Sequence, residues 1–271
     1  MNICLFSEDE IGKPLSIKDE RVQHLLKVLH KKKDDSFLAG ITGGKAGNAK
    51  ITEISEHSLS FEFTPFDSGN ASEQAKKLAE GKKLFPLKMI IGFPRPIQLK
   101  RLLRDIAALG VCEVHLTGTE LGEKSYMQST LVEKGNAYKM LLDGTVQAGS
   151  THVPELFLHK NLNECLNALE ASLDNEKISH SLRLCLDNIN PKCSLNTALE
   201  EFSCVAGGNK CMENTAVIAA IGSERGWTER ERALLEKTGY VRCGMGNRIM
   251  RTETAATVAG SIILNKMGFM E

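Results

Sequence analysis

From position 84 onward, short apolar runs alternate with amphipathic stretches, and this alternation limits the folds that the chain can adopt. The runs "LFPLKMIIGF" (84–93), "VCEVHL" (111–116) and "TAVIAAIG" (215–222) have the length and composition of buried strands. The stretches "PIQLKRLLRDIAALG" (96–110) and "TERERALLEKTG" (228–239) have helical spacing and end at a glycine. Strands that alternate with helices favour an open, largely parallel α/β sheet.

The same reading extends to four further segments of this region. Strands are expected at "SLRLCLD" (181–187) and "YVRCGM" (240–245). Helices are expected over 129–149 and 252–267. Apart from the strand at 181–187, the role of residues 160–215, which include "CVAGGNKCMEN" (204–214), is left open between a partner site and a loose insertion.

Residues 1–66 have a different pattern, rich in short β-type runs. "FLAGI", "AKITEI" and "LSFEF" are separated by the turn-forming stretches "TGGKAGN" and "EHS". This is typical of a meander or a small barrel. Residues 67–83 are polar and contain two glycines, which is linker composition. We therefore predict a β domain over 1–70, a linker over 71–83 and an α/β domain over 84–271.

Composition excludes several classes of function. The 34 basic and 34 acidic residues give zero net charge, so any site for a polyanion must be a local patch. The eight cysteines form no CxxC pair and have no histidine pair at zinc spacing, so we expect core cysteines, a reducing compartment and no metal. The N-terminus does not resemble a signal peptide, and the longest uncharged apolar run (254–265) is too short for a bilayer. A cytoplasmic protein without membrane contact is expected.

Two loops each follow an expected strand and precede an expected helix. They are "IGSERGW" (221–227) and "MGNRIMRTET" (245–254). Because ligands of open α/β sheets bind beyond the carboxyl ends of strands, these loops would form two walls of a pocket. Gly222 and Gly226 allow close backbone approach, although plain strand-to-helix turns would also use glycine. Neither loop has a P-loop or a GxGxxG pattern, which favours a ligand with an aromatic and an apolar part over a triphosphate.

The entrance of the last expected helix carries an unusual charge cluster. Arg248, Arg251 and Glu253 precede a helix with no further charge until Lys266. Helix capping requires only a hydroxyl such as that of Thr252, so the cluster is a candidate for chemistry. The alternative is an ion pair between Arg251 and Glu253 that fixes the loop. The helix itself is rich in small residues, which fits either ordinary burial or a subunit interface.

A basic run near the N-terminus is the candidate for binding RNA. Residues 21–33 contain no acid, and apolar residues at 22, 25, 26 and 29 have helical spacing. Adjacent cations on one element bind phosphates by releasing counterions, although a solvated helix face would look the same. The basic members are Arg21, Lys27, Lys31, Lys32 and Lys33.

The stretches "IGSERGWTERE" and "MGNRIMRTETAA" resemble the two signature loops of the RsmE-type 16S ribosomal RNA uridine-N3 methyltransferases of the SPOUT superfamily. This resemblance implies a PUA-like β-barrel followed by a SPOUT domain with a parallel sheet and a C-terminal trefoil knot. It implies a homodimer that binds S-adenosylmethionine and small-subunit ribosomal RNA. The implied cofactor-binding residues are Leu186, Ile221, Gly222, Glu224, Gly226, Met245, Gly246, Ile249, Met250 and Thr252.

The resemblance also gives the charge cluster a role. Arg251 and Arg248 would stabilise negative charge on uracil or contact a phosphate, and Glu253 would orient Arg251 or accept a proton. The sequence departs from the family where polar residues are usual, which leaves a non-catalytic RNA-binding dimer as the alternative. The positions where a polar partner is missing include Ala107, Leu109, Val146 and Ser150, and Arg225 stands where the family usually has a glycine.

Overall fold

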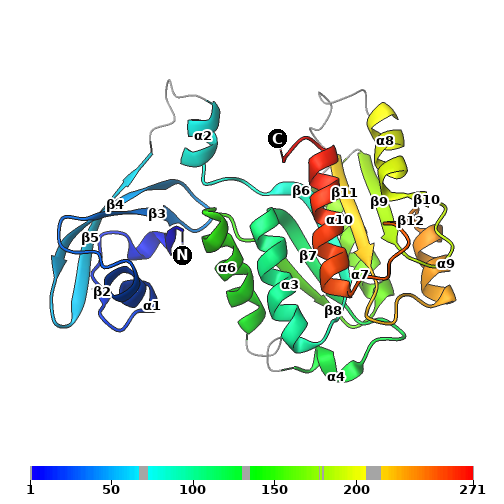
Figure 1. Ribbon diagram of the computed structural model, residues 1–271, viewed down its shortest axis with the longest axis horizontal. Helices are drawn as coiled ribbons and strands as arrows, with labels where there is room; N and C mark the ends of the chain where they lie inside the picture. The colour runs from blue at the N-terminus through cyan, green and yellow to red at the C-terminus, as the bar shows by residue number, and fades with distance from the viewer. Residues whose placement is uncertain are drawn as a thin grey trace. The chain divides into compact units, whose positions relative to one another are not determined.

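The computed structural model describes residues 2–66, 73–129, 135–176, 178, 180–205 and 215–270 (Figure 1). The chain forms two compact units, one of Met1–Leu84 with Leu142–Val153 and one of Phe85–Leu141 with Pro154–Glu271. The expected boundary near 70 differs from this division for two reasons. Helix α2 (Glu73–Ala79) of the expected linker belongs to the first unit, and the chain returns to that unit at 142–153.

The first unit is built on a five-stranded curled sheet in the order β1-β3-β4-β5-β2. Strand β1 pairs with β3 in parallel, and the remaining pairs are antiparallel. The three strands expected from the sequence are confirmed as β3, β4 and β5. The strands are β1 (Cys4–Phe6), β2 (Leu15–Ser16), β3 (Ser36–Ile41), β4 (Ala46–Ile54) and β5 (Ser58–Pro65).

Alternating residues of these strands fill the core of the first unit. The ring of Phe6 stacks on Phe61 at 4.5 Å between centroids, and Phe37 packs edge-on against Phe6. Helix α1 (Glu20–Gln23) and the π-helical turn η2 (His24–Val28) add Val22 and Leu25 to this core. Of the apolar positions predicted to share one helix face, Val22 and Leu25 are therefore buried. Leu29 is 43% exposed because the helix ends at Val28.

The second unit is built on a seven-stranded sheet whose described pairings are all parallel, in the order β10-β12-β9-β11-β6-β7-β8. The expected α/β class and the strands predicted from 84 onward are confirmed. Strands β8 and β10 lie in or near the segment that the sequence left open. The strands are β6 (Phe85–Gly92), β7 (Val111–Thr117), β8 (Glu155–His159), β9 (His180–Leu186), β10 (Cys193–Ser194), β11 (Thr215–Ile221) and β12 (Val241–Gly244).

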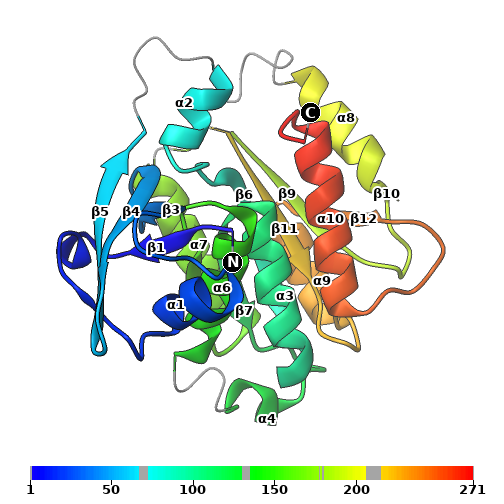
Figure 2. The same cartoon turned by 60° about the vertical axis from the view of Figure 1, so that its left-hand side comes forward.

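Helices cover both faces of this sheet. Helices α3 and α10 lie side by side on one face (Figure 2). Helix α7 packs on β7 and β8, and its leucines join α9 in a core cluster with Ile90 and Ile218 of the sheet. The helices that follow β6 in the chain are α3 (Pro96–Leu109), α4 (Lys124–Met127), α7 (Leu162–Glu176), α8 (Leu195–Val205), α9 (Glu229–Lys237), α10 (Thr252–Lys266) and α6 (Asn136–Ala148), of which α6 passes into the first unit at Leu142.

Burial on both faces explains the unbroken apolar runs of the sequence. Strand β6 is buried from Leu87 to Gly92, because successive side chains meet helices on opposite faces. Its one charge, Lys88, lies against Glu113 at 2.6 Å from nitrogen to oxygen. Helix α3 begins at Pro96 and ends before Gly110, which has a φ of 82°, as predicted. The trefoil knot stays a prediction.

Other sequence expectations have mixed outcomes. Cys4, Cys165, Cys185 and Cys243 are buried, whereas Cys112 and Cys193 are half-buried; the side chains of Cys204 and Cys211 lie outside the described residues, as does the structure of 206–214. The helix expected over 129–149 begins at Asn136, and 130–134 are likewise not described. In the described part of the chain, no helix is long and apolar enough to cross a bilayer.

Candidate active site

Strands β9, β11 and β12 lie next to one another and end at the same edge of the sheet. Leu186 pairs with Ile221 on one side and with Cys243 on the other. The loops that follow these strands enclose a cavity of about 540 Å³. This lies within the range of roughly 300–1,000 Å³ that is usual for small-molecule sites. The two predicted loops therefore meet, but β9 lies between their strands and its own loop forms a third wall.

All the residues predicted to bind the cofactor line this cavity, and their binding role stays a prediction. Several further residues line the cavity as well, some of them after β9, others in the first predicted loop or in α10. The predicted set is Leu186, Ile221, Gly222, Glu224, Gly226, Met245, Gly246, Ile249, Met250 and Thr252, and the additional lining residues include Asp187, Asn188, Ile189, Ser223, Trp227 and Ala255.

The loop after β11 is a tight turn in which glycine is required. The Gly226 N–H donates a hydrogen bond to the Ser223 carbonyl at 2.8 Å, and Gly226 has a φ of 71°. A Cβ at Gly222 would lie 2.9 Å from the Gly226 carbonyl carbon, so no side chain fits there. Thr228 then caps helix α9 in a capping box with Glu231. The turn thus presents backbone to the cavity.

Side-chain hydrogen bonds hold the pocket loops in place. The Thr252 hydroxyl, at the start of α10, donates to the Gly222 carbonyl at 3.2 Å in a buried position. The Thr119 hydroxyl, after β7, donates to the Ser223 hydroxyl at 2.9 Å. Since Thr252 joins one predicted loop to the other, the pocket walls are fixed before any ligand binds.

Asp187 fixes the third wall, the loop after β9. Its carboxylate accepts a hydrogen bond from the Ile189 N–H at 3.0 Å and forms an ion pair with Arg232 of α9 at 2.5 Å. Both side chains are buried, with 2% exposed for Asp187 and 6% for Arg232. The hydrogen bond with Asp187 raises the pKa of Arg232. An aspartate at the end of an apolar strand was the sequence signal for this residue.

The three residues predicted to be catalytic do not all line the same cavity. Arg248 lines the main cavity. Arg251 and Glu253 line a smaller one of about 240 Å³ together with Arg95, Gln98 and Glu224. Glu224 lines both cavities, so the two adjoin.

The ion pair considered between Arg251 and Glu253 is absent among the ion pairs of the described residues. Arg251 is exposed and Glu253 is buried at 8% exposure. An exposed cation and a nearly buried carboxylate therefore face the small cavity without neutralising each other.

Arg95 is a site residue that sequence reasoning missed. It follows β6, another strand that ends at this edge, and its guanidinium lies 3.3 Å from the Glu224 carboxylate. A hydrogen bond with Tyr126 and the charge of Glu224 raise the pKa of Arg95. The rule for carboxyl ends of strands applied equally to β6, and would have indicated this arginine.

Most of this chain matches known RNA methyltransferases in sequence. The family model described as an RNA methyltransferase domain matches residues 81–264, and one described as an RNA methyltransferase PUA domain matches residues 17–64. Ribosomal RNA small subunit methyltransferase E of Treponema pallidum is 36% identical over 97% of this chain and 91% of its own length. The chain belongs to the RsmE-type RNA methyltransferase family. A Borreliella burgdorferi protein, ribosomal RNA small subunit methyltransferase E 1, is 30% identical over 97% of each chain.

Two solved structures share the fold over nearly the whole chain. The Neisseria gonorrhoeae ribosomal RNA small subunit methyltransferase E, bound to S-adenosyl methionine, superimposes with a TM-score of 0.71 at 20% identity, covering 98% of this chain and 97% of that one. A probable rRNA-methyltransferase from Porphyromonas gingivalis gives a TM-score of 0.72 at 16% identity, with each chain covered to 100%. The predicted SPOUT-type fold with an N-terminal PUA-like domain is confirmed.

The basic run of this RsmE-type chain divides into two parts. Arg21 is held inside the first unit, where it forms ion pairs with Glu10 at 2.6 Å and Asp19 at 2.7 Å and lies 5.1 Å from the centre of the Phe6 ring. Its hydrogen bonds lower the pKa of Glu10 to about 2. These contacts give Arg21 a structural role in the first unit, and its RNA-binding role stays a prediction. Lys27, Lys32 and Lys33 are exposed and Lys31 is half-buried, which leaves them open to phosphate.

At three of the positions where this chain departs from the RsmE-type pattern, the side chains have structural roles. Ala107 is buried in α3, and Val146 packs against an apolar cluster of the first unit. The Ser150 hydroxyl donates to the Lys82 carbonyl at 2.9 Å. Arg225, by contrast, is exposed and lines the main cavity. Ala107, Val146 and Ser150 therefore contribute to packing or turn contacts, whereas Arg225 faces the main cavity.

Proposed function

We propose that this protein uses S-adenosylmethionine to methylate N3 of a uridine in small-subunit ribosomal RNA. The observation that carries the proposal is the cavity at the ends of β9, β11 and β12, which the residues of both signature loops line. Membership of the RsmE-type family supports the same chemistry, since the relatives of Treponema and Borreliella bear the name of a small-subunit ribosomal RNA methyltransferase.

The residues of the main cavity fit the cofactor. Leu186, Ile221 and Trp227 are buried apolar side chains that suit the adenine ring. The backbone around Gly222 has no side chain to prevent close approach. Ile249 also lines the cavity and is 84% exposed, so a bound ligand would cover an apolar side chain that now faces water. When bound, S-adenosylmethionine supplies an electrophilic methyl group.

We place the uracil in the adjoining small cavity. Uracil N3 carries a proton and is a poor nucleophile near neutral pH, so a base must accept that proton and a cation must stabilise the resulting negative charge. Glu253 is the proposed proton acceptor, because its carboxylate is nearly buried and has no ion-pair partner among the described residues. Arg251, in the same cavity, is the proposed stabiliser of negative charge on the uracil oxygens. Arg248, which lines the main cavity, is the residue proposed to contact the substrate from that side.

RNA binding and assembly complete the proposal. The exposed Lys27, Lys32 and Lys33, with the half-buried Lys31, would contact phosphates through counterion release. We propose that the protein works as a cytoplasmic homodimer. Part of the small-residue face of α10 is used within the fold, since a Cβ at Gly260 would meet Met89 at 2.8 Å.

The experiment that tests the proposal is mass mapping of methylated nucleotides in ribosomal RNA from cells with and without this protein. We expect one N3-methyluridine in small-subunit RNA to disappear with the gene and to return with the wild-type chain. Arg251→Ala should fail to restore it while binding S-adenosylmethionine normally. Arg101→Ala is the matched control, because Arg101 lies on α3 with its side chain 77% exposed. An unchanged map without the protein would refute the proposed target, and full methylation by Arg251→Ala would refute the role of Arg251.

A second candidate is a non-catalytic RNA-binding protein of the same fold. The observation that favours it is the structural use of Ala107, Val146 and Ser150, at positions where the family usually carries polar groups. Calorimetry with S-adenosylmethionine separates the two candidates. Absence of binding at millimolar cofactor would favour the non-catalytic protein, whereas saturable binding would favour the enzyme.

A further inference from the structure

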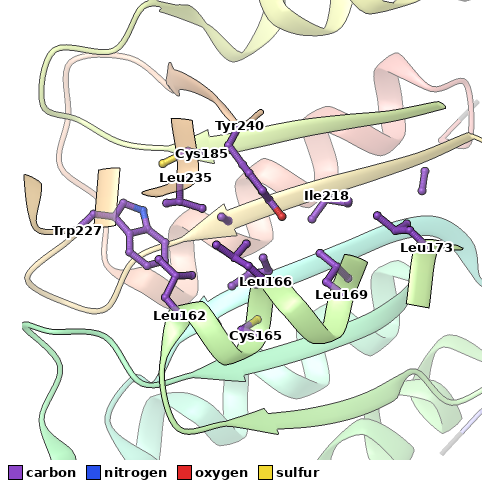
Figure 3. Close-up of a cluster of buried hydrophobic side chains, with 13 residues drawn as sticks. Leu162, Cys165, Leu166, Leu169, Leu173, Cys185, Ile218, Trp227, Leu235 and Tyr240 are labelled. Carbon is purple, nitrogen blue, oxygen red and sulfur yellow. The ribbon is translucent and has the colours of Figure 1, made fainter. Parts of the chain in front are cut away.

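A cluster of nitrogen and sulfur ligands is buried in the second unit, outside the residues that line the main cavity. It consists of His115 on β7, His159 at the end of β8 and Cys165 in the first turns of α7. One ring nitrogen of each histidine and the Cys165 sulfur all lie within 4.8 Å of one another, and all three residues are buried. Cys165 lies among the leucines of α7 in Figure 3. The cluster is unusual because these neighbours are otherwise apolar.

The sheet register brings the two histidines together. His115 pairs with Phe157 and Thr117 pairs with His159, so His115, Phe157 and His159 project from the same face. Their rings are nearly parallel: the centroids of His115 and His159 are 5.3 Å apart, with an interplanar angle of 10°. Helix α7 packs on that face and brings Cys165 to the rings. Three separate elements thus converge on one point.

A chain of charged groups orients His115. Its Nε2 lies 3.0 Å from a Glu113 carboxylate oxygen, and the other oxygen of Glu113 lies 2.6 Å from Lys88 Nζ. Lys88 is in turn 2.6 Å from the Glu176 carboxylate. The Nε2–H of His115 therefore points to a carboxylate, and the lone pair on Nδ1 faces His159 Nε2 at 3.0 Å. A carboxylate behind the far nitrogen is the usual arrangement around a histidine that binds a metal.

We propose that His115 Nδ1, His159 Nε2 and Cys165 Sγ bind one zinc ion. Imidazole and thiolate together suit Zn²⁺, whereas Mg²⁺ and Ca²⁺ require oxygen ligands. Among the described residues no fourth side chain joins the group, so a water molecule would take the remaining tetrahedral position. Of the three proposed ligands, His159 is the most exposed, at 7%.

The protons balance in this binding step. Without metal, the proton on His159 Nε2 lies between the two rings, where the nitrogen atoms are 3.0 Å apart. On binding, that proton moves to His159 Nδ1 through solvent, and the Cys165 thiol releases its proton to water. Zinc then bonds to two neutral imidazoles and one thiolate, and one proton leaves per ion bound. The ion would join α7 to β7 and β8.

Sequence spacing gave no sign of this site. The sequence predicts no metal, because no cysteine has a histidine pair at zinc spacing. His115 is far from the other two ligands in the chain, and only the pairing of β7 with β8 brings it near His159. The proposal does not depend on the methyltransferase activity.

Metal analysis of the purified full-length protein tests the site. After incubation with Zn²⁺ and removal of free metal, we expect about one zinc per chain in the wild type and at least a tenfold loss in Cys165→Ser. Cys185→Ser is the matched control, because Cys185 is also fully buried and belongs to the same core cluster. The control should retain its zinc. A wild type without zinc, or a Cys165→Ser protein that retains it, would overturn the proposal.

A second measurement on the wild type covers the case in which Cys165→Ser fails to fold. Titration of the metal-free protein with Co²⁺ should give the absorption of a tetrahedral site together with a thiolate-to-metal charge-transfer band. Zn²⁺ should then abolish both signals and raise the melting temperature, whereas Mg²⁺ should do neither. Absence of a charge-transfer band at saturating Co²⁺ would contradict ligation by Cys165.

Discussion

Replacing Arg232 by methionine should destabilise the second unit strongly, because it leaves a buried carboxylate without its partner. Arg232 Nε lies 2.5 Å from an oxygen of Asp187, and the two side chains are 6% and 2% exposed. Methionine keeps much of the apolar stem of arginine but removes the charge and the donors. The perturbation therefore acts on the ion pair more than on packing.

The structure sets the expected magnitude. Breaking a buried ion pair by removing one partner costs about 3–5 kcal/mol. The other partner of Arg232, Glu229, is 82% exposed, so that pair contributes less than about 1 kcal/mol. We expect a loss of about 3–5 kcal/mol in the free energy of unfolding. The double variant with Asp187→Asn should recover part of it, since the asparagine carries no charge and keeps an oxygen for the Ile189 N–H.

Urea unfolding, monitored by tryptophan fluorescence, measures this loss of stability in the second unit, which contains Asp187 and Arg232. The sequence contains one tryptophan, Trp227, which is 2% exposed in the core of the second unit. Arg230→Met on the same helix is the matched control, because the Arg230 side chain is 89% exposed and lies 3.7 Å from Glu120. Exposed pairs of this kind contribute about 0–1 kcal/mol, so the control should stay near wild type.

The difference in the free energy of unfolding between Arg232→Met and Arg230→Met tests this explanation. If Arg232→Met lost no more stability than Arg230→Met, the buried pair would not hold the loop after β9 as argued. If the double variant were less stable than Arg232→Met alone, the unpaired carboxylate would not be the cause of the loss. Cofactor affinity should fall in parallel, because Asp187 anchors a wall of the main cavity.

Three further predictions address other parts of the molecule. Thr252→Val removes the buried hydrogen bond to the Gly222 carbonyl, so calorimetry should show S-adenosylmethionine binding about fivefold more weakly, equivalent to about 1 kcal/mol. The pKa of Glu10 is lowered from 4.5 to about 2 by hydrogen bonds from Arg21, so its stabilisation is present above pH 4.5 and is lost as the pH falls toward 2. Hydrogen exchange of the β3–β5 amides, corrected for the chemical exchange rate, should show this loss of stability at low pH. In the Glu10→Gln variant the pH-dependent loss should be smaller. Lys32→Ala should lower the slope of log affinity against log salt for RNA by about one, measured by fluorescence anisotropy.

Much of the architecture follows from local sequence pattern. The apolar run 84–93 forms β6, and the stretch with Pro96 at its start and Gly110 after its end forms α3. These segments are readable because each has a strong periodicity and chemically distinct ends. The strands β8 and β10 and helix α8 were not assigned, since their segments are short or carry no such signals at their ends. The strand register and the boundaries between the two units depend on contacts between segments far apart in the chain, so local sequence pattern does not predict them.

In the candidate site, too, local sequence predicts some residues, and others are brought in only by contacts between distant segments. The signature loops were identified from their residues, and all the cofactor positions taken from them line one cavity. Arg95 and Gln98 were missed, and Arg251 and Glu253 line a separate small cavity with them. The reason is that strand order is not written in any one segment: β9 lies between β11 and β12, and β6 lies on the far side of β11.

The sequence by itself determined which segments become strands and helices, which loops border a ligand pocket and to which family the chain is similar. These properties depend on residues close together in the chain, where periodicity, glycine positions and capping act. Only the tertiary structure decided that Arg21 is used in packing, that Asp187 anchors the pocket, and that His115, His159 and Cys165 meet. Each of these depends on a contact between distant segments, and burial then determines whether a charged or ligating group serves stability or chemistry.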